Sequence, residues 1–177
     1  KLASGIAPVL ELMDVGVDVG IGTDGASSNN DLDMFEETRL AALLPKGVLK
    51  NPLALPAEEA IAMATIYGAR VLGLEKLIGS LEPGKRADII VVDMNSIHNM
   101  PHFETTGLNV YSRLVYAAKG NDVRDVLING RFTVRDHNLV TLDAKELVQQ
   151  ASQTAQRVNK FFVTHGTNVL DKLLSIG

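Results

Sequence analysis

The sequence predicts an α/β fold, and two observations support this prediction. First, in residues 17–22 the apolar residues Val17, Val19 and Ile21 alternate with Asp18 and two glycines. This pattern indicates a strand buried on both faces, which helices must cover and which favours a parallel sheet. Second, strand, loop and helix patterns follow one another along the chain.

Helices are predicted on both sides of this strand. Residues 8–13, PVLELM, form a short helix that Asp14 and Gly16 end. The next helix starts near Asp31 or Asp33, because carboxylates are favoured at a helix N-terminus, and Pro45 is expected to stop it. Its apolar residues are Leu32, Phe35, Leu40, Leu43 and Leu44.

A further helix starts at Pro56, whose fixed φ suits the start of a helix, and ends at Gly73. Small residues form one narrow face of this helix, so another element can approach it closely. The residues of this face are Ala57, Ala60, Ile61, Ala64, Gly68, Val71 and Leu72.

The pattern changes to strands from residue 78 onward. Residues 83–84, Pro-Gly, indicate a turn, and residues 87–93, ADIIVVD, form an apolar run too short for a typical helix. The run VLINGRFTV predicts a hairpin, because Asn129 and Gly130 accept the positive φ angles of a type I′ turn. Residues 136–138 turn the chain again.

The last predicted helix has Asp143 as its N-cap and Glu146 three residues later, as in a capping box. Apolar residues recur at three and four positions, which predicts one buried stripe. Its members are Leu147, Ala151, Ala155, Val158 and Phe162. Lys145, Arg157 and Lys160 are too few basic residues to favour a membrane surface over ordinary packing.

The composition excludes several classes of function. The net charge is −4 and no basic stripe is present, which argues against a nucleic acid partner. No apolar run is long enough to span a membrane. The chain has no Cys, which excludes a disulfide framework and favours a cytoplasmic protein.

Asp24 is the candidate reactive residue, because it follows the predicted buried strand. In parallel α/β sheets and barrels, catalytic groups collect at the C-terminal ends of strands. The alternative interpretation is an ordinary Asp-Gly turn, in which Asp24 tolerates left-handed geometry and Gly25 supplies a positive φ. Ser28 and Asn29 are either solvated loop residues or side chains that hold the Asp24 loop in shape.

His98 and His102 are four residues apart, a spacing that two zinc ligands on one helix face can have. Pro101 lies between them and argues for a loop. Solvent-facing or hydrogen-bonded histidines are therefore the preferred interpretation, and zinc binding by this pair is the minor alternative.

The chain resembles one known family in two long stretches, GTDGASSNNDLDMFEE and NPLALPAEEAIAMATIYGARVLGLEKLIGSLEPGKRADIIVVD. They are similar to the C-terminal part of the amidohydrolase superfamily, in the branch of 5-methylthioadenosine/S-adenosylhomocysteine deaminases and their chlorohydrolase relatives. The similarity runs from residue 1 to about residue 143, and SNNDLDM at residues 28–34 is the stretch that favours the adenosine-type deaminases.

The resemblance implies the C-terminal part of a metal-dependent (β/α)8 barrel in residues 1–77 and part of a small β-sandwich in residues 78–142. Residues 143–177 would form a helix packed on the barrel. The implied reaction is hydrolytic deamination of a purine nucleoside with a divalent metal, most simply zinc. Asp24 would ligate this metal and shuttle protons, with Ser28 and Asn29 supporting its loop.

The resemblance also implies residues that cannot be placed here, namely an HxH pair, two further histidines and a Glu upstream of Asp24. The chain begins at Lys1 without Met, so a fragment that is inactive alone is expected, with exposed edges that favour a homo-oligomer. Two alternatives remain open. The parent could be a triazine hydrolase or a guanine or cytosine deaminase, or the piece could be a non-catalytic module.

Overall fold

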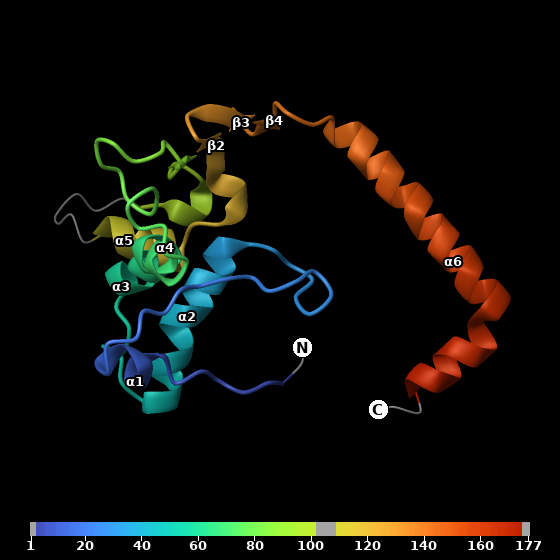
Figure 1. Cartoon of the computed structure of the whole chain (residues 1–177), viewed down its shortest axis with the longest axis horizontal. Helices are drawn as coiled ribbons and strands as arrows, with labels where there is room; N and C mark the ends of the chain where they lie inside the picture. Colours follow the sequence, from blue (N-terminus) through green and yellow to red (C-terminus); the bar gives the residue numbers. More distant parts are fainter. Residues whose placement is uncertain (1–2, 102–108, 175–177) are drawn as a thin grey trace. The chain divides into compact units, whose positions relative to one another are not determined.

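The computed structural model describes residues 3–101 and 109–174, and the chain divides into two compact units, residues 1–137 and 138–177. The helices of unit 1 are α1 (Val9–Asp14), α2 (Met34–Leu49), α3 (Ala57–Ala62), η1 (Met63–Tyr67), α4 (Gly68–Val71), η2 (Ile97–Asn99), α5 (Asn109–Tyr116) and η3 (Gly120–Asp122). Its strands are β1 (Ile89–Val92), β2 (Val123–Ile128) and β3 (Arg131–Arg135). Unit 2 holds β4 (Asn138–Leu139) and α6 (Ala144–Leu174), so the α/β fold class is confirmed (Figure 1).

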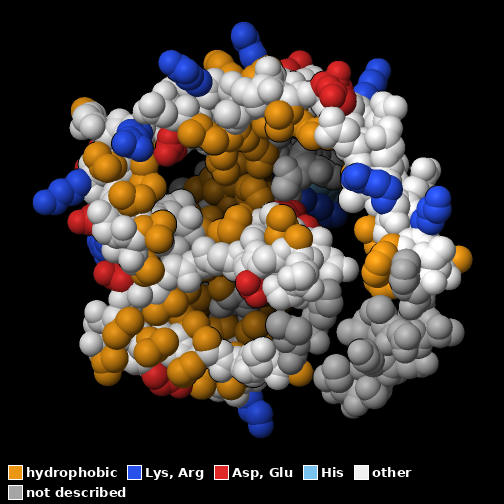
Figure 2. Space-filling model, turned by 45° about the vertical axis from the view of Figure 1, so that its right-hand side comes forward, with side chains coloured by type: hydrophobic (Ala, Val, Ile, Leu, Met, Phe, Trp, Pro, Cys, Tyr) orange, Lys and Arg blue, Asp and Glu red, His pale blue; other side chains and the backbone are white. Residues whose placement is uncertain are grey.

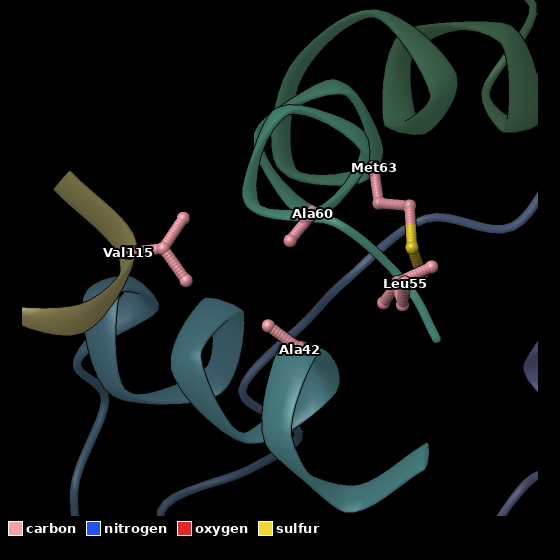
Figure 3. Packing of buried hydrophobic residues seen from close by; sticks show 5 residues of the cluster. All are labelled: Ala42, Leu55, Ala60, Met63 and Val115. Atoms are coloured by element: carbon pink, nitrogen blue, oxygen red, sulfur yellow. The ribbon is translucent and has the colours of Figure 1, made fainter. Parts of the chain in front are cut away.

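The helices of unit 1 surround a small core. Its buried cluster is Ala42, Leu55, Ala60, Met63 and Val115, contributed by α2, the segment before α3, α3, η1 and α5 (Figure 3). Two members are alanines, whose small side chains let the helix backbones approach closely, and the leucines of α2 are largely exposed. The core therefore fixes α2 against α3 and α5, which positions the loop that precedes α2.

The strand predicted at residues 17–23 is not formed. These residues are extended but join no ladder in the described structure, and Figure 1 draws them as a plain blue trace. Val19 and Ile21 are half-buried against the core, whereas Val17 is exposed. A strand needs a neighbour for its N–H and C=O groups, and none lies beside this segment in residues 3–101 and 109–174.

The sheet of unit 1 lies in residues 89–135 and is antiparallel, and the parallel sheet expected around residues 17–22 is not formed in the described residues. β1 pairs with β2, and β2 pairs with β3 through the predicted hairpin. Asn129 and Gly130 have φ angles of 50° and 77°, which confirms the predicted turn. The turn at residues 136–138 is also confirmed, with Asp136 and His137 in the left-handed region.

α2 begins where the sequence predicted, with Asp33 as its N-cap, but Pro45 does not end it. The helix continues to Leu49 with Pro45 buried inside it, and the turn after Pro45 is held by contacts outside the helix. The Lys46 ammonium donates to the carbonyl oxygens of Ala54 and of Leu55, the latter at 2.7 Å. These contacts tie the turn after Pro45 to the segment that follows the helix, whereas the bond that proline cannot make is the one to the carbonyl four residues before it.

The predicted helix from Pro56 to Gly73 is confirmed, with a π-helical turn at η1 that the sequence did not indicate. Gly73 has a φ of 68°, and its N–H donates to Arg70 O at 2.9 Å. The small-residue face makes the close approach expected of it: a Cβ on Gly20 would lie 3.0 Å from Gly68 Cα. The extended residues 17–23 thus pack closely on this helix.

α6 begins at the predicted cap, since Asp143 Oδ1 accepts hydrogen bonds from the backbone N–H groups of Lys145 and Glu146. Within unit 2 taken by itself, residues of the predicted stripe such as Leu147, Val158 and Phe162 are exposed. Packing of this stripe on a barrel stays a prediction. None of the described helices is both long and apolar enough to cross a bilayer.

Candidate functional site

Asp24 lies in a tight turn directly after the extended residues 17–23. Its φ is 59°, a left-handed conformation that Asp adopts more readily than most residues because its short side chain bonds locally. The left-handed residue of this turn is therefore Asp24, and Gly25 does not have the positive φ expected of it. The conformation turns the Asp24 carboxylate onto the loop that follows.

The loop holds both carboxylate oxygens of Asp24. The Gly25 N–H donates to Oδ1 at 2.7 Å, and the Ser28 hydroxyl donates to Oδ2 at 2.6 Å. The backbone N–H groups of Ser28 and Asn29 both donate to Gly25 O, at 3.1 and 2.8 Å. These bonds close a compact turn, so Asp24 is fixed although it is exposed.

Asn29 connects this turn to α2. Its Nδ2 donates to Thr23 O at 3.1 Å and to Glu37 Oε1 at 2.5 Å. The amide therefore joins the backbone just before Asp24 to the first turn of the helix. Sequence reasoning proposed Asn29 as a loop support but did not identify Glu37 as its partner.

Asp24 opens onto a hollow of about 440 Å³. The hollow is lined by Ala3, Ser4, Gly5, Gly22, Thr23, Asp24, Ser28, Asn29, Glu36, Glu37 and Leu40. Carboxylates, hydroxyls and backbone groups line it, which suits a polar ligand more than an apolar one.

Two pKa shifts describe the charge of this region. The hydrogen bond from Ser28, and then that from the Gly25 N–H, hold the pKa of Asp24 below its ordinary value. A hydrogen bond shared with Asp31, together with repulsion from that carboxylate, raises the pKa of Glu36. Asp24 is consequently ionised at neutral pH and available as a ligand or proton acceptor.

The described residues do not complete a metal site. Among them no group of three or more His, Cys, Asp or Glu side chains could hold a metal ion. Asp24 fits as one ligand, since a carboxylate that accepts two hydrogen bonds still has free lone pairs. Zinc takes three or four protein ligands, so a zinc site would need further residues.

His98 does not contribute to the Asp24 region. It lies in η2, a single 3₁₀ turn where a loop was expected, and its Nε2 is 2.8 Å from Asp122 Oδ2. His102 lies outside the described residues. The preferred interpretation of His98 as a hydrogen-bonded residue is confirmed.

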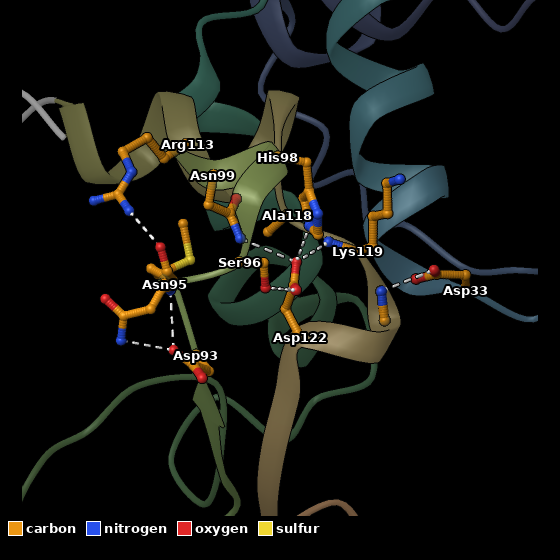
Figure 4. Close-up of polar contacts among 12 residues, drawn as sticks. Asp33, Asp93, Asn95, Ser96, His98, Asn99, Arg113, Ala118, Lys119 and Asp122 are labelled. Carbon is orange, nitrogen blue, oxygen red and sulfur yellow. Dashed lines mark hydrogen bonds and ion pairs between the residues drawn. The ribbon is translucent and has the colours of Figure 1, made fainter. Parts of the chain in front are cut away.

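Asp122 is a buried carboxylate, 4% exposed, that the sequence did not single out. Besides His98, it accepts hydrogen bonds from Ser96 Oγ (2.6 Å), Asn99 Nδ2 (3.2 Å) and Lys119 N (2.9 Å) (Figure 4). Burial opposes its ionisation, but these four bonds hold its pKa far below the ordinary range. Three of its partners lie more than 20 residues away in sequence, so no local pattern could have indicated this network.

Comparison with known proteins gives the chain a family. The model of the amidohydrolase family matches residues 1–133. A 5-methylthioadenosine/S-adenosylhomocysteine deaminase of Moorella thermoacetica is 54% identical over 153 residues, which are 86% of this chain and 35% of the relative. A 5'-deoxyadenosine deaminase of Methanobrevibacter smithii is 46% identical over 90% of this chain and 36% of the relative. The chain thus spans about a third of the length of these relatives.

Two solved structures agree with this result. An adenosine deaminase from Xanthomonas campestris with bound zinc aligns with a TM-score of 0.83 and 42% identity, over 90% of this chain and 35% of that chain. Atrazine chlorohydrolase from Arthrobacter aurescens TC1, complexed with zinc, aligns with a TM-score of 0.75 and 28% identity, over 84% of this chain and 32% of that chain. The resemblance inferred from the GTDG and SNNDLDM stretches is confirmed: the chain belongs to the amidohydrolase family.

Proposed function

We propose that this chain is part of a metal-dependent hydrolytic deaminase of adenosine-type nucleosides, to which it contributes Asp24. The relatives at 46–54% identity are named as deaminases of 5-methylthioadenosine, S-adenosylhomocysteine or 5'-deoxyadenosine. The observation that carries the proposal is the Asp24 carboxylate, which is held by Ser28 and Gly25 at the edge of a polar hollow.

Asp24 has the properties of a proton carrier in such a reaction. As the oxygen of a water bonds to C6 of the adenine ring, its proton passes to the Asp24 carboxylate. The proton then passes to the departing nitrogen, the C6–N bond breaks and ammonia leaves. A divalent metal, when bound, lowers the pKa of a bound water toward neutrality. The fixed orientation of Asp24 keeps the carboxylate from rotating away between the two proton transfers.

The remaining ligands, the group that protonates the ring and the ribose contacts would come from outside the described residues. The zinc in the Xanthomonas and Arthrobacter structures supports zinc as the metal of the assembled protein. This chain alone is expected to be inactive, because Asp24 is one ligand among the three or four that zinc requires.

A triazine hydrolase is the second candidate, supported by the alignment with atrazine chlorohydrolase. Its 28% identity is well below the 42–54% of the adenosine-type relatives. The deaminase is therefore the preferred function.

A hybrid enzyme tests the proposal. This chain replaces the matching 35% of the Moorella thermoacetica relative, and zinc content and ammonia release are measured. We expect ammonia from 5-methylthioadenosine, S-adenosylhomocysteine or 5'-deoxyadenosine and no chloride from atrazine. A folded, zinc-loaded hybrid that releases chloride from atrazine, or that deaminates none of these nucleosides, would contradict the proposed function.

A further inference from the structure

Asp33 joins two parts of unit 1 that are far apart in sequence. It is the N-cap of α2, where its Oδ1 accepts a hydrogen bond from Phe35 N at 2.8 Å. Its Oδ2 accepts a second bond, at 3.0 Å, from the N–H of Gly120, which lies 87 residues further along the chain. Figure 4 shows the Asp33 side chain directed from α2 toward the η3 turn. An N-cap needs only the first bond, so the second requires its own explanation.

The η3 turn, which accommodates this bond, is closely packed and held in place by other contacts. A Cβ on Gly120 would lie 2.9 Å from Asp33 Oδ2 and 3.1 Å from Asp33 Cγ, so only glycine permits the approach without a shift. The same turn is fixed from its other side, because Asp122 Oδ2 accepts the Lys119 N–H at 2.9 Å and is itself buried.

Arg39 provides a separate anchor further along α2. Its Nε and one terminal nitrogen donate to Val115 O at 3.1 Å and to Ala118 O at 2.6 Å. Glu37, which holds Asn29, lies between the Asp33 and Arg39 anchors. Loss of the Asp33 bridge should therefore loosen the first turn of α2 and the Asp24 loop, while the rest of the helix stays in place.

We propose that Asp33 is a positioning residue that fixes the Asp24 loop by bridging the α2 N-terminus to η3. Three hydrogen bonds hold the loop. The Ser28 hydroxyl donates to Asp24, the Asn29 amide donates to Glu37, and the Gly120 N–H donates to Asp33. Asp33 anchors the end of the loop that continues into the helix. The catalytic consequence rests on the proposed function of Asp24, whereas the bridge itself does not.

Substitution of Asp33 by Asn separates its two roles. Asn is a good N-cap and keeps one acceptor for Phe35 N, but its NH₂ group cannot accept from Gly120 N. The matched control is Asp143→Asn, at the N-cap of α6, where the carboxylate accepts hydrogen bonds from N–H groups of its own helix. Gly120→Ala removes the same bridge from the other side, through the steric conflict with Asp33.

Amide hydrogen exchange on the full chain is the first measurement. In Asp33→Asn and in Gly120→Ala we expect the Ser28 and Asn29 amides to exchange about tenfold faster, because each substitution removes a hydrogen bond that holds the loop. Amides of α3 should be unchanged, and the double variant should match the single variants rather than add to them. If the Ser28 and Asn29 amides exchange at the same rate as in the unsubstituted chain, the proposal that this bridge fixes the loop is wrong.

Kinetics of the hybrid enzyme are the second measurement. Asp33→Asn should lower kcat about tenfold and leave KM within about twofold, because a displaced Asp24 affects proton transfer more than substrate binding. Asp143→Asn should change neither. Faster exchange together with an unchanged kcat would overturn the positioning role. An unsubstituted hybrid without deaminase activity would count against the proposed function, and the exchange result would still decide the bridge.

Discussion

At the scale of single residues, Asp24 shows that a turn role and a reactive role are compatible. The left-handed φ and the bond from the Gly25 N–H are what an Asp-Gly turn requires. The bond from Ser28 adds a constraint on the second oxygen that a simple turn does not need. The geometry is compatible with both a turn residue and a reactive carboxylate, so the two roles of Asp24 have to be distinguished by substituting it.

Asp24→Asn in the hybrid enzyme is expected to lower kcat at least ~100-fold, because removal of a general base typically costs that much. Asn also tolerates the left-handed conformation, so the fold and melting temperature should be retained. Asp18→Asn, at an exposed carboxylate 3.5 Å from Arg70, is the control and should be near normal. Retention of more than about a tenth of the activity would assign Asp24 to the turn alone.

Asp122 is expected to make the stability of the chain depend on pH in the acid range. Its pKa is lowered in the folded state from an ordinary value of 3.8, so the folded state favours the ionised form. This stabilisation is fully present above about pH 4 and is lost as the pH falls further toward the folded pKa.

Asp122→Asn should therefore lower the free energy of unfolding by about 2–4 kcal/mol near neutral pH, since several charge-assisted bonds are lost. It should also flatten the decline of stability below about pH 4. Urea denaturation of the full chain at several pH values measures both, with Asp14→Asn at an exposed position as control. Parallel acid profiles for Asp122→Asn and the unsubstituted chain would show that other carboxylates control acid unfolding.

At the scale of elements, the packing of residues 17–23 on the α3–η1–α4 helix depends on two glycines. A Cβ on Gly20 would lie 3.0 Å from the backbone of Gly68, closer than an ordinary contact, whereas a Cβ on Gly22 would have no neighbour within 4 Å. The two glycines lie in the same extended segment and neither has a positive φ. They form a matched pair for testing the contact.

Gly20→Ala should destabilise the chain by about 1–3 kcal/mol, because a methyl group forced against backbone atoms shifts the segment from the helix. Gly22→Ala should change stability by less than about 1 kcal/mol in either direction. Urea denaturation of both variants gives the comparison. Equal stabilities would mean that residues 17–23 are not held against the helix in solution.

At the scale of the whole molecule, unit 1 exposes much apolar surface for its size. Hydrophobic side chains are visible over much of the face in Figure 2, and the exposed large residues include Val17, Leu53, Val71 and Leu72. A hollow of about 430 Å³ lies where residues 20–22 meet the α3–η1–α4 helix. Unpaired extended backbone beside apolar side chains recruits partners.

The isolated chain is therefore expected to form a dimer or larger species through this surface. Size-exclusion chromatography with light scattering measures the mass, and Val71→Lys, at an exposed position of the surface, should shift the population toward monomer. The same lysine substitution at Val163, exposed on α6, is the control. A sharply eluting monomer of the unsubstituted chain at all concentrations would contradict this expectation.

The chain alone is also expected to retain no stoichiometric zinc after dialysis, because Asp24 supplies one ligand. Metal analysis before and after dialysis, with the hybrid enzyme as the positive control, tests this. One zinc per chain, lost on Asp24→Asn, would mean that this chain completes its own site.

The local elements could be predicted from the sequence because each depends on contacts within a few residues. Asp33 and Asp143 cap helices through N–H groups two or three positions ahead, and Gly73 ends its helix through Arg70 O. Asn129-Gly130 sets its hairpin by its own φ angles. The support of Asp24 by Ser28 could also be predicted from the sequence, because the two residues are only four positions apart.

Only the tertiary structure decided the features whose partners are distant in sequence. Gly120 meets Asp33 across 87 residues, and Asp122 is hydrogen-bonded to His98 and Asn99 of η2, which lie more than 20 residues away. Residues 17–23 have the pattern of a buried strand, yet they form no ladder in the described structure, because pairing depends on a neighbouring strand as well as on composition. Pro45 remains inside α2, and Lys46 holds the next turn through Ala54 and Leu55. Local patterns determine which conformation a segment prefers, and the groups that satisfy its hydrogen bonds determine whether that conformation persists.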